Sequence, residues 1–272
     1  MTLRELNLNN SQCLRKILNV SGLQNLETIS FQHCKNLIQI HDSIGLLSKL
    51  KILDAEGCSK LKSFPPLKLT SLEQLQLSFC ESLKWFPEIL GQMMNIKVIV
   101  LKGTSIKEFP FSFRYLTGLH TLGIWGSGML RLPGNIYMMP NLSEVYVQGF
   151  QLLPIQHDEL NSTVFSNVQK LRLIKCNLPN ELLSTLLMWF ANVKYLNLLG
   201  SNFTILPECL KDCHYLSSLN MNCCKYLQEI QGIPASLKHV SALRCESLTS
   251  SSRIMLLNQV FFIVFVFILH SI

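Results

Sequence analysis

Charged residues are scarce in this sequence, and the familiar motifs of catalysis are missing from it. Asp, Glu, Lys and Arg make up 15% of the 272 residues, whereas 48% are hydrophobic. This balance excludes an intrinsically disordered chain, which has too little apolar surface to bury. No acidic dyad, G-x-x-x-x-G-K-[ST] phosphate loop or G-x-S-x-G nucleophile elbow occurs. We therefore expect no enzymatic activity, no metal site and no cofactor.

Blocks of like charge and an export sequence are also absent. The formal net charge is +7, but the lysines and arginines are scattered along the sequence. A nucleic-acid partner is not expected, because phosphate binding needs clustered cations, whereas an acidic protein partner suits the charge. The chain start has no apolar stretch typical of a secretory signal. Ten cysteines without such a signal indicate free thiols in a reducing compartment.

A short leucine motif recurs along the whole chain. The segment Leu72–Cys80 has the form L-x-x-L-x-L-x-x-C. We call its first position the frame start and number later positions from it as +1, +2 and so on. Successive starts lie 21 to 26 residues apart, within the period of about 20–29 residues of leucine-rich repeats. Eleven frame starts share one register: Leu3, Leu26, Leu50, Leu72, Ile96, Leu119, Leu142, Val168, Val193, Leu216 and Leu237.

The alternation of leucines within the motif predicts the fold. L-x-L places the leucines on one face of a short strand and the residues between them on the other. Stacked repeats then share a core, because no repeat buries its apolar face alone. Six cysteines fall at +8, where a small thiol fits a bend: Cys34, Cys58, Cys80, Cys176, Cys224 and Cys245. We predict an α/β leucine-rich-repeat solenoid (horseshoe), with a short-stranded parallel sheet on its concave face, over residues 1–253.

The returning half of each repeat is expected to turn at prolines, which cannot donate to a hydrogen-bonded ladder. Pro65 and Pro87 are examples. Residues 88–94 are expected to supply a helical turn. The longer repeat that starts at Val168 leaves room for a helix over residues 181–192.

Positions +2, +4 and +6 are predicted to face outward on the concave surface. Early repeats place a polar, slightly acidic set there: Thr28, Ser30, Gln32, Asp54, Glu56, Gln74 and Gln76. Apolar residues at such positions, which mark contacts when contiguous, are Val98, Val100, Ile174 and Leu199. Aromatic and arginine side chains are typical interface anchors. The candidate protein-binding residues are Lys102, Trp125, Tyr146, Lys170, Arg172 and Tyr195. The alternative is that solvent-facing positions simply tolerate such residues.

Cysteine and histidine gather in one region without a standard pattern. Cys209, Cys213 and His214 precede the pair Cys223–Cys224, but this spacing fits no usual zinc motif. No cysteine shares a motif with a histidine that would activate it as a nucleophile. We interpret these thiols as packing residues.

The return segments resemble those of a known family. C-x-x-L-x-x-F-P, as at Cys80–Pro87, alternates with G-T-S-I-K-E-F-P at Gly103–Pro110. This alternation resembles plant intracellular immune receptors of the Toll/interleukin-receptor, nucleotide-binding, leucine-rich-repeat class. The resemblance implies that the region senses pathogen effectors, restrains the receptor's nucleotide-binding module and acts in the cytoplasm or nucleus. It implies protein partners: an effector, a host protein, or the parent's own nucleotide-binding domain.

The sequence also departs from that family. It contains no nucleotide-binding loop and no signalling domain, and its first repeat starts at residue 3 without a polar cap. We therefore expect a fragment of a larger receptor. The alternative function is a general leucine-rich-repeat scaffold or substrate adaptor unrelated to immunity.

A hydrophobic C-terminal tail, residues 254–272, follows the repeats. Its core, Val260–Leu269, is ten apolar residues long, short of the roughly 20 that cross a bilayer. Three alternatives stay open: a short membrane anchor, a strand or helix that packs over the last repeat, or non-native sequence. We favour the last, and membrane association is not expected.

Overall fold

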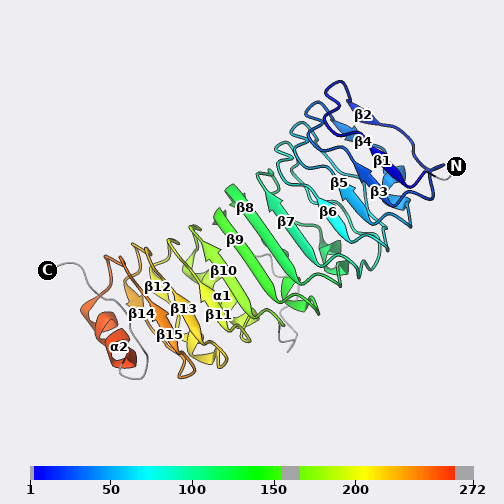
Figure 1. Cartoon of the computed structure of the whole chain (residues 1–272). Coiled ribbons are helices and arrows are strands. Elements are labelled where there is room, and N and C mark those ends of the chain that lie inside the picture. Colours follow the sequence, from blue (N-terminus) through cyan, green and yellow to red (C-terminus); the bar gives the residue numbers. More distant parts are fainter. Residues whose placement is uncertain (1–2, 155–165, 261–272) are drawn as a thin grey trace. The chain divides into compact units, whose positions relative to one another are not determined.

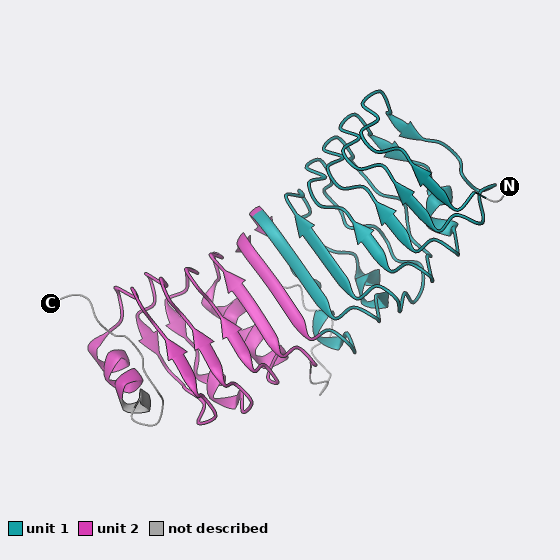
Figure 2. Cartoon of the chain, in the orientation of Figure 1, with its two compact units in different colours: residues 1–126, 130–142 teal, residues 127–129, 143–272 magenta. Residues whose placement is uncertain are grey.

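The computed structural model describes residues 3–154 and 166–260. Short strands joined by loops dominate these residues, with little helix (Figure 1). The chain divides into two compact units (Figure 2). Unit 1 comprises residues 1–126 and 130–142, and unit 2 comprises residues 127–129 and 143–272.

A β-strand begins two positions after every frame start. In unit 1 these strands are β1 (Glu5–Asn7), β3 (Thr28–Ser30), β5 (Ile52–Asp54), β6 (Gln74–Gln76), β7 (Val98–Lys102) and β8 (Thr121–Leu130), of which residues 127–129 are assigned to unit 2. In unit 2 they are β9 (Glu144–Leu152), β10 (Lys170–Ile174), β11 (Tyr195–Asn197), β13 (Ser218–Asn220) and β15 (His239–Ser241). Neighbouring repeats pair in parallel, as β3 does with β5 and β10 with β11. The predicted solenoid with a parallel sheet is confirmed.

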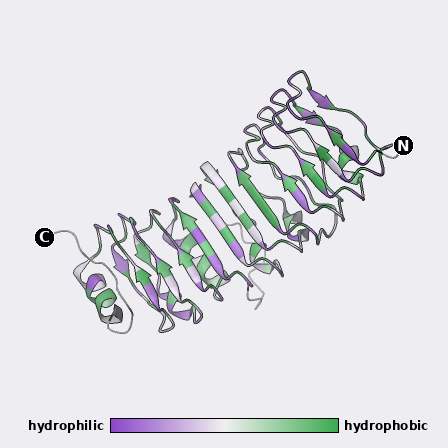
Figure 3. Cartoon of the chain, viewed as in Figure 1, coloured by the Kyte–Doolittle hydropathy of each residue, from purple (hydrophilic) through white to green (hydrophobic). Residues whose placement is uncertain are grey.

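The leucines of the motif form the core. In β6, Leu75 at +3 is 3% exposed and pairs with the fully buried Leu53 of β5. Leu77 at +5 is also fully buried, whereas the glutamines on either side of Leu75 face away from the core. Hydrophobic and hydrophilic residues therefore alternate in bands along the strands (Figure 3).

Each cysteine at +8 ties its bend to the preceding repeat. The Sγ of Cys58 donates to the carbonyl of Phe31 at 3.1 Å, and that of Cys80 donates to Ala55 at 3.2 Å. Ser201 takes this position in its own repeat, and its hydroxyl donates to Leu173 at 2.6 Å. A small donor at +8 thus adds a hydrogen bond to a buried carbonyl of the preceding repeat; the carbonyl of Phe31, for example, also accepts from the backbone N–H of Cys34.

The residue at +7, just before the thiol, has a left-handed backbone in ten of the eleven repeats. Gly57 and Gly200 adopt this conformation without strain, at φ 74° and 66°. Phe79 and Lys175 adopt it with a side chain, at φ 60° and 51°. The bend turns the chain away from the sheet and leaves the +7 side chain beside the outward-facing strand positions.

The returning halves are built from short elements. They are the two-residue strands β2 (Lys16–Ile17), β4 (Gln39–Ile40), β12 (Ile205–Leu206) and β14 (Glu229–Ile230), and the 3-10 helices η1 (Asp42–Leu46), η2 (Phe111–Tyr115), η3 (Ile136–Met138) and η4 (Glu208–Asp212). The predicted helix is present as α1 (Asn180–Trp189), which ends three residues earlier than expected. The predicted helical turn at residues 88–94 is wrong. Ile89 instead forms a parallel bridge with Leu67, and the chain there is extended.

Helix α2 (Ser250–Val260) follows the last strand of unit 2. The hydroxyl of Thr249 caps it by accepting from the backbone N–H of Ser252. The Ser252 hydroxyl in turn accepts from the Ile230 N–H of β14 at 3.0 Å, and Leu256 is buried. The expected domain boundary after residue 253 falls inside this helix. Residues 261–272 of the tail lie outside the described residues, and no described helix is long and apolar enough to cross a membrane.

The core register predicts a large effect of an inward charge. Leu77→Asp would bury an unpaired carboxylate in a fully buried site. The free energy of unfolding should fall by more than about 4 kcal/mol, or the chain should fail to fold. Gln74→Asp, on the exposed side of the same repeat, should stay within about 0.5 kcal/mol of wild type. Urea unfolding followed by circular dichroism measures both, and equal effects would refute the register.

Candidate protein-binding face

The sheet face consists of the outward strand positions +2, +4 and +6. All six candidate residues lie at such positions, two in unit 1 and four in unit 2. Their exposure varies: Lys102 and Tyr195 are exposed, whereas Trp125, Tyr146, Lys170 and Arg172 are half-buried. Because these side chains stand on hydrogen-bonded strands, the backbone atoms from which they project are held in place.

Four side chains of β9 and β10 form a connected group on the sheet face of unit 2. Lys170 lies beside Glu144 in the parallel register, and its Nζ donates to Glu144 Oε1 at 2.6 Å. The Tyr146 hydroxyl donates to Oε2 of the same carboxylate at 2.6 Å. The Arg172 guanidinium lies 4.6 Å from the Tyr146 ring centroid, within cation–π range. Tyr195 on β11 pairs in register with Lys170. We call these five residues the β9–β11 cluster.

The carboxylate of Glu144 sets the electrostatics of this cluster. Hydrogen bonds from Lys170 and Tyr146 lower the pKa of Glu144 below its ordinary value. The same contact raises the pKa of Lys170. Burial, followed by the hydrogen bond to Glu144, raises the pKa of Tyr146. These shifts favour the carboxylate of Glu144, the ammonium of Lys170 and the neutral phenol of Tyr146 at neutral pH.

The two candidates in unit 1 lie side by side on β7 and β8. Lys102 and Trp125 are partners in the parallel register. The Lys102 Nζ lies 5.4 Å from the ring centroid of Phe79, which sits at a left-handed +7 position. A Cβ at Gly123 would lie 2.2 Å from the Trp125 ring, so glycine there gives the indole room to fold back along β8. This site offers a lysine and two aromatic rings.

The residues that orient the candidates were not predicted from the sequence. Glu144 lies at +2, as Lys170 and Tyr195 do, so the frame could have identified it. Phe79 and Gly123 gave no comparable indication, because neither a left-handed bend nor a ring above a glycine follows from the repeat pattern. Tyr146 and Lys170, taken from the sequence as separate anchors, are joined through Glu144.

All ten cysteines are free thiols, and seven of them are buried. Within residues 3–154 and 166–260, no group of three or more His, Cys, Asp or Glu residues could hold a metal ion. Burial raises the pKa of Cys58, Cys80, Cys213 and Cys224 to about 12. Thiols with such pKa values hold their protons at neutral pH and are poor nucleophiles.

We predict that thiol labelling at pH 7.5 will separate two classes of cysteine. Cys13 is exposed and should react with a maleimide quickly. Cys58 and Cys224 should react only as the chain unfolds, because they are buried and protonated. Mass spectrometry of digests at timed intervals measures each rate. Rapid labelling of a cysteine at +8 in the native chain would contradict the packing role and reopen thiol chemistry.

The Glu144–Lys170 ion pair predicts a pH-dependent stability. Since the folded-state pKa of Glu144 is lowered, its stabilising effect exists above the ordinary carboxyl pKa of about 4.3 and disappears as pH falls through the folded value. Glu144→Gln should therefore unfold more easily than wild type at pH 7, with the difference vanishing in acid. Glu246→Gln, which removes a carboxylate that forms no ion pair within the described chain, is the control. Urea midpoints across this pH range test it, and a difference that grew in acid would disprove the assignment.

Comparison with known proteins places the repeats in a family. Residues 68–268 match the family model for the leucine-rich repeats of RPS4B-like disease resistance proteins. The chain is 30% identical over 249 residues to TMV resistance protein N of Nicotiana glutinosa, covering 89% of this chain and 21% of that protein. It is 40% identical over 123 residues to disease resistance protein RPP2A of Arabidopsis thaliana, covering 45% of this chain and 9% of that protein. The chain thus spans about a fifth or less of the length of these relatives.

A solved structure of the same fold supports the architecture. The leucine-rich repeat domain of the type III effector XopL aligns with a TM-score of 0.54 at 18% identity, over 87% of this chain and 74% of that domain. This similarity concerns the fold alone. The family assignment depends instead on the sequence match over most of the chain, and it confirms the resemblance predicted from the return segments. The chain belongs to the leucine-rich-repeat family of RPS4B-like plant disease resistance proteins.

Proposed function

We propose that this chain is the protein-recognition module of a plant immune receptor and that it binds a pathogen effector or a host protein through its sheet face. The observation that supports this proposal is the β9–β11 cluster. Its Tyr146 ring and Arg172 guanidinium are stacked and oriented by Glu144 before any partner arrives. Aromatic and arginine side chains dominate binding energy at protein interfaces, and pre-ordered side chains lose less entropy on binding.

The module acts by binding and not by catalysis. Leucine-rich-repeat domains are interaction modules, and burial raises the pKa of thiols such as Cys58 and Cys80 to about 12. In the parent receptor the same repeats restrain the nucleotide-binding module until a partner binds. Such a receptor works in the cytoplasm or the nucleus, where the free cysteines stay reduced.

A paired-variant capture experiment tests the sheet face. Arg172→Ala with Tyr195→Ala removes a guanidinium and an exposed ring from the cluster while leaving inward residues intact. Immobilised wild-type chain and the variant are incubated with extract from infected leaves, and a protein lost from the variant is then purified. Calorimetry with that protein should show binding at least tenfold weaker to the variant, which is about 1.4 kcal/mol or more.

The matched control lies on the returning half of unit 2. Glu208→Ala with Lys211→Ala removes an exposed ion pair of η4, where Nζ and Oε1 are 2.6 Å apart. This variant should capture the same protein with unchanged affinity. If both variants lose it, or if neither does, the sheet face of unit 2 is not the binding site. If the captured protein is a substrate of an unrelated enzyme complex, the scaffold alternative replaces the immune role.

A further inference from the structure

Basic side chains of unit 1, distant in sequence, line up in one column after the strands. The backbone N–H of Ile38 donates to the carbonyl of Arg15, and the backbone N–H of Lys62 donates to the carbonyl of Ile38. Arg131 N–H donates to the Lys107 carbonyl at 2.7 Å. These bonds place equivalent positions of successive repeats side by side.

The centre of the column follows from the same pattern. Lys84 follows the buried Leu83 as Lys62 follows the buried Leu61. The bridge between Trp85 and Glu108 sets Lys84 beside Lys107. The column positions of six repeats are therefore Arg15, Ile38, Lys62, Lys84, Lys107 and Arg131, which we call the basic column.

The column brings like charges together with little compensation. Neighbouring strands are about 4.8 Å apart, so Lys62, Lys84, Lys107 and Arg131 occupy roughly 14 Å. Only Arg131 has a counter-charge, Glu108 at 3.7 Å. The other four cationic side chains are exposed, and none of them forms an ion pair or hydrogen bond with the described residues. Like charges facing each other on adjacent strands destabilise a fold.

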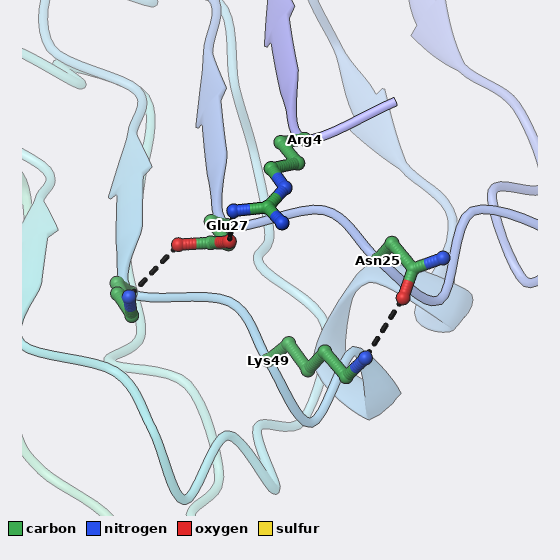
Figure 4. Close-up of polar contacts among 5 residues, drawn as sticks. Arg4, Asn25, Glu27 and Lys49 are labelled. Carbon is green, nitrogen blue, oxygen red and sulfur yellow. Dashed lines mark hydrogen bonds and ion pairs between the residues drawn. The ribbon is translucent and has the colours of Figure 1, made fainter. Parts of the chain in front are cut away.

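Several cations elsewhere in the same unit have polar partners, although the side chains of Lys16, Lys35 and Lys68 form no ion pair or hydrogen bond with the described residues. Before the strands, Glu27 accepts from Arg4 at 3.2 Å and from Lys51 at 2.8 Å (Figure 4). Lys49 donates to the Asn25 side chain at 2.8 Å (Figure 4). The basic column is therefore distinguished by the position of its unpaired cations, which lie side by side in successive repeats.

The fold does not require cations at these positions. The equivalent backbone ladder in unit 2 runs through Thr204, Gln228 and Thr249. The N–H of Gln228 donates to the carbonyl of Thr204 at 2.8 Å, and the N–H of Thr249 donates to the carbonyl of Gln228 at 3.0 Å. All three are uncharged, as is Ile38 within the column itself. The same backbone ladder thus forms with neutral side chains, and the repulsion in unit 1 has no structural purpose.

We propose that the basic column is a second interaction surface, which binds an extended acidic peptide segment of a partner protein. Successive carboxylates along such a segment neutralise the column and relieve its repulsion. Trp85 is 57% exposed next to Lys84, and Ile38 is 39% exposed, so apolar side chains within the acidic segment also find contacts. One isolated aromatic ring is a poor platform for successive nucleic-acid bases, which favours a peptide. This proposal does not depend on the sheet face.

Peptide binding by the whole chain tests the proposal. The probe is a fluorescein-labelled peptide of ten glutamates, and fluorescence anisotropy is measured in 50 mM and 300 mM NaCl. The column variant combines Lys62→Gln, Lys84→Gln and Lys107→Gln. It should bind the peptide at least tenfold more weakly than wild type at low salt. Wild-type binding should weaken steeply at high salt.

A matched variant separates the column from net charge. Lys194→Gln, Lys225→Gln and Lys238→Gln neutralise three exposed lysines of unit 2, so both triple variants have a formal charge of +4, three below the wild-type +7. The control should bind the peptide within twofold of wild type. The column variant should also unfold at the same or a higher temperature, because repulsion is removed.

Three outcomes would overturn the proposal. They are equal losses in both variants, no peptide binding by wild type at 50 mM NaCl, and tighter wild-type binding to a labelled ten-nucleotide single strand than to the peptide. The last outcome would assign the column to nucleic acid. None of them bears on the capture experiment with Arg172 and Tyr195, so the two surfaces fail or succeed separately.

Discussion

The structure depends on the fact that no repeat can bury its own apolar face. Each strand contributes one or more apolar side chains to a core that the neighbouring repeats complete, and Leu75 against Leu53 is one step of that ladder. The +8 thiol adds a polar tie in the same direction, from Cys80 to the preceding repeat. Every contact that stabilises the chain is therefore local along the stack, and a change in one repeat acts first on its neighbours.

This constraint explains why so much of the fold follows from the sequence. Inward positions must be apolar and regularly spaced, so each frame start marks a strand that begins two residues later. The strand register follows, and with it the outward placement of Trp125, Tyr146 and Arg172. Stacking imposes a pattern on the inward residues only.

The failures come from interactions that the repeat pattern does not encode. Residues 88–94 contain helix-compatible side chains. However, the N–H of Leu90 donates to the carbonyl of Leu67 in the preceding repeat, so it is not available for a local helical hydrogen bond. Pairing between repeats wins over local propensity there, whereas the longer repeat after Val168 accommodates α1. The bond from Lys170 to Glu144 joins strands 26 residues apart, a relation visible only once register is known.

Charge that is scattered along the sequence is concentrated in space where equivalent positions of successive repeats lie side by side. A period of 21 to 26 residues separates cations such as Lys62 and Lys84 along the chain, but stacking brings them to neighbouring rungs. The backbone ladder forms equally with uncharged residues, as at Thr204 and Gln228. Cations at these positions are therefore not needed for the fold and are available for binding. The two outward surfaces consequently differ in chemistry. The sheet face neutralises its central charges internally through Glu144 and offers rings, whereas the basic column leaves its charges for a partner to neutralise.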